Sequence, residues 1–96
     1  MHQKKERHMS ISQIPQKYRD AHKASFQNKR LVMKAKLCGC FYCGRVYPAS
    51  EVESWSPDRE DMTAICPYCF IDSVIPDASG FSLDAEFLRD MQRYWF

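Results

Sequence analysis

Two pairs of cysteines, each with two residues between its members, constrain this chain more than any other feature. The pairs are Cys40–Cys43 and Cys66–Cys69, and 22 residues separate them. Two intervening residues let both thiolates of a pair converge on one ion from a tight turn. Two such pairs, roughly 15–25 residues apart, supply the four ligands of a tetrahedral zinc site. The spacing therefore predicts one zinc ion per chain, held by Cys40, Cys43, Cys66 and Cys69.

The length of the chain explains why a metal would matter. Ninety-six residues make one domain, which buries only about two thirds of the surface that its unfolded chain exposes. Domains of this size are usually stabilised by disulfides, a metal or a partner. The sequence contains no signal-peptide pattern and no apolar run long enough to span a bilayer. We therefore expect a cytoplasmic protein without a membrane partner, in which disulfides do not persist.

Two alternatives remain open at the metal site. An iron–sulfur centre or a rubredoxin-like iron site uses the same ligands, so spacing alone does not separate iron from zinc. The fifth cysteine, Cys38, is an alternative ligand in place of Cys40; otherwise it is a small buried residue or a thiol beside the site. Four thiolates fill the coordination sphere of a structural zinc ion, so we do not expect the metal to be catalytic.

The remaining pattern predicts a small α+β zinc-binding domain flanked by two helices. Residues 1–13 are polar and basic and are expected to be flexible, whereas residues 14–96 form a single zinc-stabilised domain. In that domain we predict a basic helix over residues 16–36, which no Gly or Pro interrupts. A zinc module follows over residues 37–75, and an amphipathic helix over residues 82–95 closes the chain.

Within the zinc module we predict a short β-hairpin. Residues 45–47 and 62–65 read as its two strands, with a helical turn at 50–53 and a turn at 56–58 between them. Residues 70–75 form either a strand or the first turn of a helix. The expected architecture is a zinc ribbon or a treble clef with two zinc knuckles.

The closing segment carries the clearest periodicity in the sequence. Its apolar residues recur at helical spacing on one face, behind Ser82 as the expected N-cap: Leu83, Phe87, Leu88, Met91, Tyr94 and Trp95. We expect this stripe to pack on the zinc module. The alternative is a partner or self-association interface, for which Phe87, Met91, Tyr94 and Trp95 are the candidate contacts.

Charge divides the chain into two unlike parts. Residues 1–37 carry ten Lys and Arg against two carboxylates, and residues 38–96 carry four against ten. A basic helix suggests contacts with nucleic-acid phosphates, and the candidate residues are Lys23, Lys29, Arg30, Lys34 and Lys36. The acidic remainder, which bears most of the aromatic residues, would repel nucleic acid.

Six short motifs together resemble a family of short bacterial proteins known only as cytoplasmic proteins. They are Cys38-Gly-Cys-Phe-Tyr-Cys43, Glu51-Val-x-x-Trp55, Thr63-Ala-Ile-Cys-Pro-Tyr-Cys69, Ile71-Asp-Ser-Val-Ile75, Phe87-Leu-x-x-Met91 and Tyr94-Trp-Phe96. The resemblance covers roughly residues 22–96. It implies a bacterial or phage intracellular origin and a two-knuckle zinc fold, and no particular activity. It also draws attention to His22 and Ser25, and this chain departs from it at Phe70, where glycine often follows the second pair.

No catalytic constellation emerges from the sequence. His22 lies far from the other polar candidates, Asp72 and Ser73, and the segment between the cysteine pairs contains no His. The chain is therefore expected to be a non-catalytic adaptor or regulatory protein that binds another protein. The alternative is a nucleic-acid-binding zinc ribbon that uses the basic helix. Beyond the terminal stripe, His22, Trp55 and Asp72 are the candidate interaction residues.

Overall fold

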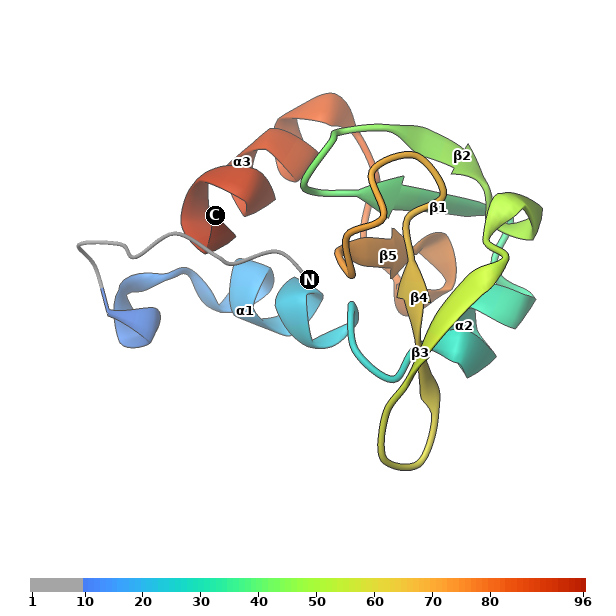
Figure 1. The fold of residues 1–96 in the computed structure, drawn as a ribbon. Helices are drawn as coiled ribbons and strands as arrows, with labels where there is room; N and C mark the ends of the chain where they lie inside the picture. The colour runs from blue at the N-terminus through green and yellow to red at the C-terminus, as the bar shows by residue number, and fades with distance from the viewer. Residues whose placement is uncertain (1–9) are drawn as a thin grey trace.

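Three α-helices and two antiparallel sheets make up residues 10–96, the part of the chain that the computed structural model describes (Figure 1). This confirms the prediction of a small α+β domain. In chain order the elements are α1 (Gln16–Lys23), α2 (Lys29–Lys34), β1 (Leu37–Cys40), β2 (Val46–Pro48), β3 (Ser54–Pro57), β4 (Met62–Ile65), β5 (Val74–Pro76) and α3 (Ala85–Trp95). Single 3₁₀ turns are formed by Ile11–Gln13, Ala49–Glu51 and Asp77–Ser79.

A three-stranded sheet in the order β2–β1–β5 lies at the centre of the molecule. β1 pairs antiparallel with both neighbours, so that Cys38 lies opposite Tyr47 and Gly39 lies opposite Ile75. Because successive side chains of a strand point to opposite faces, Cys38 and Cys40 face one side of the sheet and Gly39 the other.

The two faces of this sheet carry two separate hydrophobic cores. On the Gly39 side, α1 and α3 enclose Ile14, Ala21, Phe41, Ile75, Phe87, Leu88, Met91 and Trp95. On the Cys38 side, α2 and the second hairpin enclose Val32, Cys38, Cys40, Tyr47, Ala49, Val52, Ala64, Cys66 and Val74. Glycine at position 39 lets α3 approach closely, since a Cβ there would lie 3.3 Å from Leu88 Cδ1.

The terminal helix packs within its own chain, as its apolar stripe predicts. Phe87, Leu88, Met91 and Trp95 are all buried in the core on the Gly39 side of the central sheet. The predicted N-cap is wrong, however. Asp84 Oδ1 accepts a hydrogen bond from Phe87 N at 2.8 Å and caps a helix that begins at Ala85, while the hydroxyl of Ser82 lies 3.2 Å from the other Asp84 oxygen.

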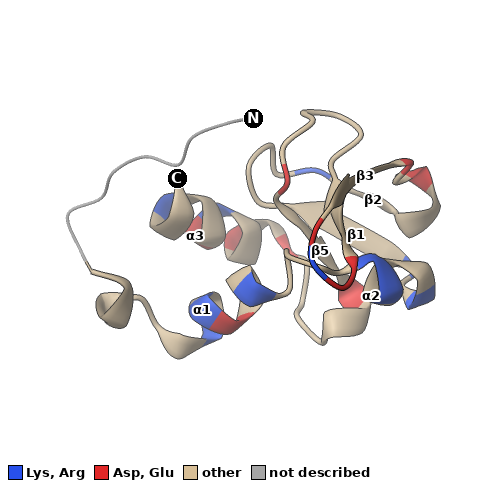
Figure 2. Cartoon of the chain, turned by 60° about the horizontal axis from the view of Figure 1, so that its bottom comes forward, with Lys and Arg blue, Asp and Glu red and all other residues tan. Residues whose placement is uncertain are grey.

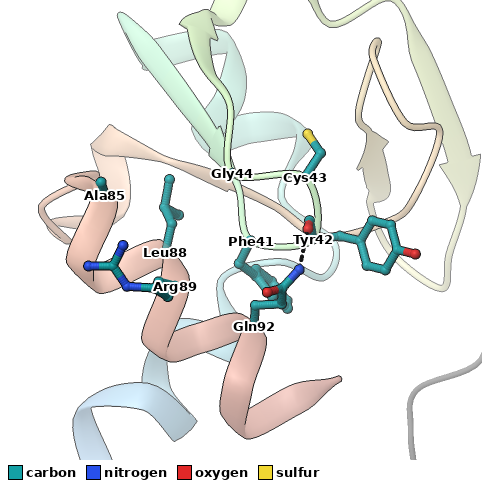
Figure 3. Close-up of a pocket in the computed structure, with 8 residues that line it drawn as sticks. All are labelled: Phe41, Tyr42, Cys43, Gly44, Ala85, Leu88, Arg89 and Gln92. Carbon is teal, nitrogen blue, oxygen red and sulfur yellow. Dashed lines mark hydrogen bonds between the residues drawn. The ribbon is translucent and has the colours of Figure 1, made fainter.

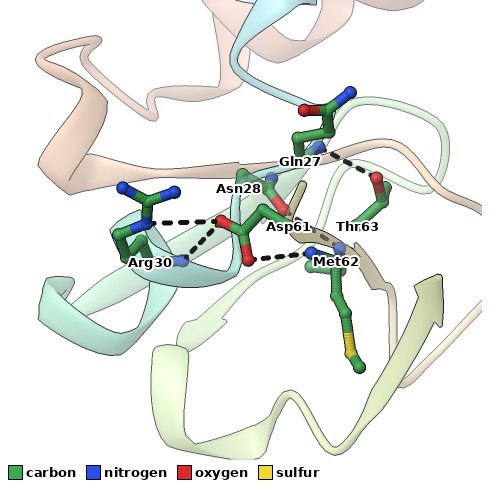
Figure 4. A network of polar contacts seen from close by, with 7 residues as sticks. Gln27, Asn28, Arg30, Asp61, Met62 and Thr63 are labelled. Atoms are coloured by element: carbon green, nitrogen blue, oxygen red, sulfur yellow. Dashed lines mark hydrogen bonds and ion pairs between the residues drawn. The ribbon is translucent and has the colours of Figure 1, made fainter. Parts of the chain in front are cut away.

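The single basic helix predicted over residues 16–36 is wrong. The chain forms two short helices, α1 and α2, because the segment between them leaves helical geometry at Gln27, whose φ is +48°. Asn28 explains the break (Figure 4). Its amide donates to Ala24 O and Val74 O, both at 2.9 Å, and accepts from Ala64 N at 3.0 Å. Such tertiary hydrogen bonds override local helix propensity.

The predicted hairpin partners are also wrong, although both strands exist close to where they are predicted. Residues 62–65 form β4, which pairs with β3 and not with β2. The predicted turn at 56–58 lies partly inside β3, which ends at Pro57. Of residues 70–75, for which a strand or a helical turn is predicted, only Val74 and Ile75 lie in a strand, β5, which adds to the free edge of β1.

The predicted basic segment over residues 1–13 lies mostly outside the described residues. Within residues 10–96, no helix combines the length and apolar character needed to cross a membrane.

Candidate metal centre

The sulfurs of the four paired cysteines lie close together on the Cys38 side of the central sheet. Their Sγ atoms all lie within 4.8 Å of one another. Cys40 Sγ lies 3.6 Å from Cys69 Sγ, and Cys43 Sγ lies 3.8 Å from Cys66 Sγ. A tetrahedral ion with metal–sulfur bonds of about 2.3 Å requires sulfur–sulfur distances of about 3.8 Å. The cluster therefore has the composition and size of a metal site.

Two loops of the same conformation supply these cysteines. In each loop, the amide one residue after the second cysteine donates to the carbonyl of the first: Gly44 N to Cys40 O at 2.8 Å, and Phe70 N to Cys66 O at 2.9 Å. Both donating residues have positive φ, +80° and +64°. The next residue accepts from the first cysteine of its pair, as Arg45 O does from Cys40 N and Ile71 O from Cys66 N.

Backbone amides of both loops also point at sulfur. Tyr42 N and Cys43 N each lie 3.4 Å from Cys40 Sγ, and Tyr68 N lies 3.4 Å from Cys66 Sγ. These donors favour the thiolate over the thiol, because hydrogen bonds to the charged form stabilise it. The thiol of Cys40 is the largest influence on Cys66, whose pKa falls to about 4, and Tyr47 and the loop amides lower it further.

Two hydroxyl groups lie beside the two fully buried sulfurs. Ser73 is completely buried, and its Oγ lies 3.1 Å from Cys40 Sγ. The buried hydroxyl of Tyr47 has no hydrogen bond of good geometry among the described residues. It is nevertheless close enough to Cys66 to influence it: burial, followed by the contact with Cys66, raises the pKa of Tyr47. A buried hydroxyl normally has an acceptor, and the Cys66 sulfur would become one if it bound a metal as a thiolate. The unpaired Tyr47 hydroxyl therefore fits a metal site.

Cys38 lies outside the cluster. It is fully buried on β1, and burial, with a smaller contribution from Asp77, raises its pKa to about 12. Its sulfur is not among the four that lie within 4.8 Å of one another. The geometry therefore favours Cys40 over Cys38 in the ligand set.

The other predicted site residues are spread over the molecule. The His22 ring stacks on Trp95 with centroids 3.8 Å apart, on the opposite side of the sheet from the cysteines. Trp55 is half-buried on β3, and the centroid of its ring lies 5.2 Å from Lys29 Nζ. It lines a mostly apolar groove between α2 and the 49–52 segment. Asp72 is half-buried just after the second loop. The terminal stripe is covered by its own chain, so little of Phe87, Met91 and Trp95 is left for a partner.

The predicted nucleic-acid contacts do not share one helix face (Figure 2). The helix break places Lys23 at the end of α1 and the other four residues on or just after α2. Arg30 on α2 is engaged by Asp61, which accepts from its backbone amide at 3.2 Å and lies 3.9 Å from its Nε. A single basic helix face extending over residues 16–36 is therefore not formed.

A shallow pocket of about 220 Å³ lies between α3 and the first cysteine loop (Figure 3). Gln92 Nε2 donates to Tyr42 O at 2.6 Å across its floor, which ties the loop to the helix. The residues that line it are Phe41, Tyr42, Cys43, Gly44, Ala85, Leu88, Arg89 and Gln92. This lining offers one guanidinium group and neither a carboxylate nor an imidazole that could act as a general base.

Sequence reasoning missed Tyr47 as a neighbour of the sulfurs and considered Ser73 only as a polar candidate for catalysis. A signal for both was present, because each stands four residues after the second cysteine of its pair. The chain matches no family model, no curated protein and no solved structure. The resemblance to short bacterial proteins stays a prediction.

Proposed function

We propose that this protein is a non-catalytic zinc-binding adaptor of the zinc-ribbon type, which binds another protein through the surface of its two cysteine loops. Four thiolates at tetrahedral spacing support one zinc ion with no open position. A strand, β5, follows the second loop, and this favours a zinc ribbon over a treble clef. Native mass spectrometry of protein purified without chelator is expected to show one zinc per chain; no metal, or iron in its place, would overturn this assignment.

The observation that carries the adaptor proposal is the conformation of Phe70. This residue has a φ of +64°, in the left-handed region that is unfavourable for a bulky side chain, and it is 72% exposed. The equivalent position in the first loop is Gly44. Phe70 thus bears a conformational cost without gaining burial in its own chain. Strained residues of this kind concentrate at binding sites, where the side chain is needed by a ligand.

Other exposed side chains of the two loops accompany Phe70. We define the loop surface as Tyr42, Arg45, Tyr68 and Phe70. The two tyrosines are about half exposed. Arg45 lies over the Tyr68 ring at 5.0 Å, and the Tyr68 hydroxyl donates to Glu51 at 2.5 Å. Exposed aromatic residues with one arginine have the composition of a protein–protein hot spot.

The charge around the loop surface favours a protein over a nucleic acid as the partner. Arg45 is its one basic residue, whereas Glu51 and Asp72 lie on or beside the second loop. Four thiolates around one divalent zinc ion add a net charge of about −2. Phosphates would be repelled from such a surface.

Replacing Phe70 by glycine is expected to stabilise the metal-loaded protein. The left-handed backbone costs an L-residue about 1–2 kcal/mol, while glycine loses about 0.5–1 kcal/mol more chain entropy on folding. The net gain is about 0.5–1 kcal/mol, which raises Tm by about 2–8 °C. Thermal unfolding followed by circular dichroism measures it. Gly44→Ala is the matched control and is expected to destabilise the protein, because the φ of Gly44 is +80°. The new Cβ would meet no atom within 4 Å, so this loss would come from the backbone conformation and not from a clash.

The same Phe70→Gly variant tests the adaptor function. Metal-loaded wild type, Phe70→Gly and Met33→Ala are used to isolate binding proteins from host extracts, and each candidate is then purified and titrated by calorimetry. Met33 is the control because it is 70% exposed on α2, away from the loops. We expect Phe70→Gly to weaken binding at least tenfold, as for a hot-spot residue, and Met33→Ala to change it less than twofold.

Two outcomes would contradict the proposal. One is a partner whose affinity is the same for wild type and Phe70→Gly. The other is binding of a single-stranded oligonucleotide that falls steeply with salt and is lost on replacing Lys34 and Lys36 by Ala, which would favour the nucleic-acid alternative.

A further inference from the structure

We propose that the hydroxyl of Tyr47 donates a hydrogen bond to the metal-bound thiolate of Cys66, as the counterpart of the Ser73 hydroxyl on Cys40. This inference rests on the metal occupancy that is part of the proposed function. It assigns Tyr47 and Ser73 as positioning residues of the metal site, which hold and partly neutralise the two buried thiolates.

The two cysteine loops repeat one backbone geometry. Relative to the second cysteine of each pair, the residue at +1 has positive φ, and the carbonyl at +2 accepts from the amide of the first cysteine. Ser73 stands at +4 in the second loop, and Tyr47 stands at +4 in the first. Equivalent positions in two loops that share these hydrogen bonds are expected to face equivalent atoms.

One of these two positions contacts a sulfur directly. Ser73 Oγ lies 3.1 Å from Cys40 Sγ, the first cysteine of the opposite loop. By the same relation, Tyr47 faces Cys66, which is the first cysteine of the loop opposite its own. Each loop therefore supplies a hydroxyl to the buried sulfur of the other, and the two loops brace each other across the metal.

The Tyr47 hydroxyl is buried and needs an acceptor. Tyr47 is only 3% exposed, and its oxygen has neither water contact nor a hydrogen bond of good geometry among the described residues. A buried tyrosine hydroxyl normally finds an acceptor, because leaving it unpaired is costly. By the loop relation above, the acceptor that this hydroxyl faces is the sulfur of Cys66. As a metal-bound thiolate it becomes a charged acceptor, which strengthens the hydrogen bond.

In this arrangement the two hydroxyl groups fall on one sulfur of each pair. Cys40 and Cys66 are fully buried and receive the loop amides, and each has one hydroxyl beside it. Cys43 and Cys69 are partly exposed. Since hydrogen bonds withdraw charge from a thiolate, Cys40 and Cys66 are the less nucleophilic ligands, and ligand exchange is expected to begin at Cys43 or Cys69.

The test compares Tyr47→Phe and Ser73→Ala with wild type in two measurements. Transfer of zinc to a chromogenic chelator at neutral pH gives the metal affinity, and the absorption spectrum of the cobalt(II)-substituted protein reports the charge on sulfur. We expect each variant to lose about tenfold in metal affinity, as is typical for partners of metal ligands. We also expect the sulfur-to-cobalt charge-transfer band to move to longer wavelength, because a thiolate that loses a hydrogen bond becomes more electron-rich.

Tyr18→Phe serves as the matched control. It also removes a tyrosine hydroxyl, which here donates to Asp90 at 2.9 Å on the far side of the sheet. General destabilisation would affect this control as well, but it would not move the charge-transfer band. Normal metal binding by wild type, with an unchanged band in Tyr47→Phe, would overturn this inference alone. A wild-type protein that binds no metal would overturn the proposed function too.

Discussion

Removal of the metal ion by a strong chelator is expected to unfold the domain. A structural zinc ion contributes on the order of 10–16 kcal/mol in finger peptides, whereas a domain of this kind has a net stability of about 5–15 kcal/mol. Without the ion, four cysteines gathered within 4.8 Å would be left with competing thiols and thiolates. Loss of amide dispersion in a ¹H–¹⁵N correlation spectrum after dialysis against chelator, restored by one equivalent of zinc, measures the effect.

The control for metal removal is Cys69→Ser, studied beside a Cys38→Ser variant. The first removes a proposed ligand and is expected to lose the folded spectrum even with zinc present. The second replaces the buried thiol outside the cluster and is expected to keep its metal and its fold. A metal-free wild-type protein with a native spectrum would contradict the expectation.

Asn28→Ala is expected to produce the largest loss of stability among substitutions outside the cysteines, about 3–5 kcal/mol. Asn28 is 1% exposed and bonds the backbones of Ala24, Ala64 and Val74. Truncation leaves buried backbone groups without partners, and each unsatisfied group costs about 1–3 kcal/mol. Urea denaturation of the metal-loaded protein measures the change.

Met33→Ala on α2 is the control for Asn28→Ala, because Met33 is largely exposed. It is expected to stay within about 0.5 kcal/mol of wild type, as surface substitutions usually do. A loss of less than about 1 kcal/mol in Asn28→Ala, the cost of one unsatisfied buried group, would show that the amide does not hold the segment between α1 and α2 to β4 and β5.

Cysteine spacing and helical periodicity were sufficient to predict the parts of the fold that depend on local pattern. The ligand cluster of Cys40, Cys43, Cys66 and Cys69 follows from the two short loops. The burial of Phe87, Leu88 and Met91 follows from a stripe at helical spacing. In both cases the residues in contact are close in sequence or bind the same ion, so the pattern can be recognised without knowing the tertiary contacts.

The features that could not be predicted depend on contacts between distant segments. The helix break at residues 24–28 contains neither Gly nor Pro and is stabilised by Asn28 bonding to β4 and β5, 36 and 46 residues away. The pairing of β4 with β3 depends on β1 having taken β2 and β5 as neighbours. The proposed roles of Tyr47 and Ser73 emerge only when the two loops are seen to be equivalent.

The position of β1 between the two cores links the metal site to α3. Cys38 and Cys40 point to the metal side of this strand, while Gly39 lies beneath Leu88 of α3. Any shift of β1 that follows metal release therefore disturbs the packing of α3 on this strand. Trp95 of α3 stacks on His22. The fluorescence of Trp95 is thus expected to change on metal release, which takes place on the opposite face of the sheet. The two hydrophobic cores are expected to unfold as one cooperative unit.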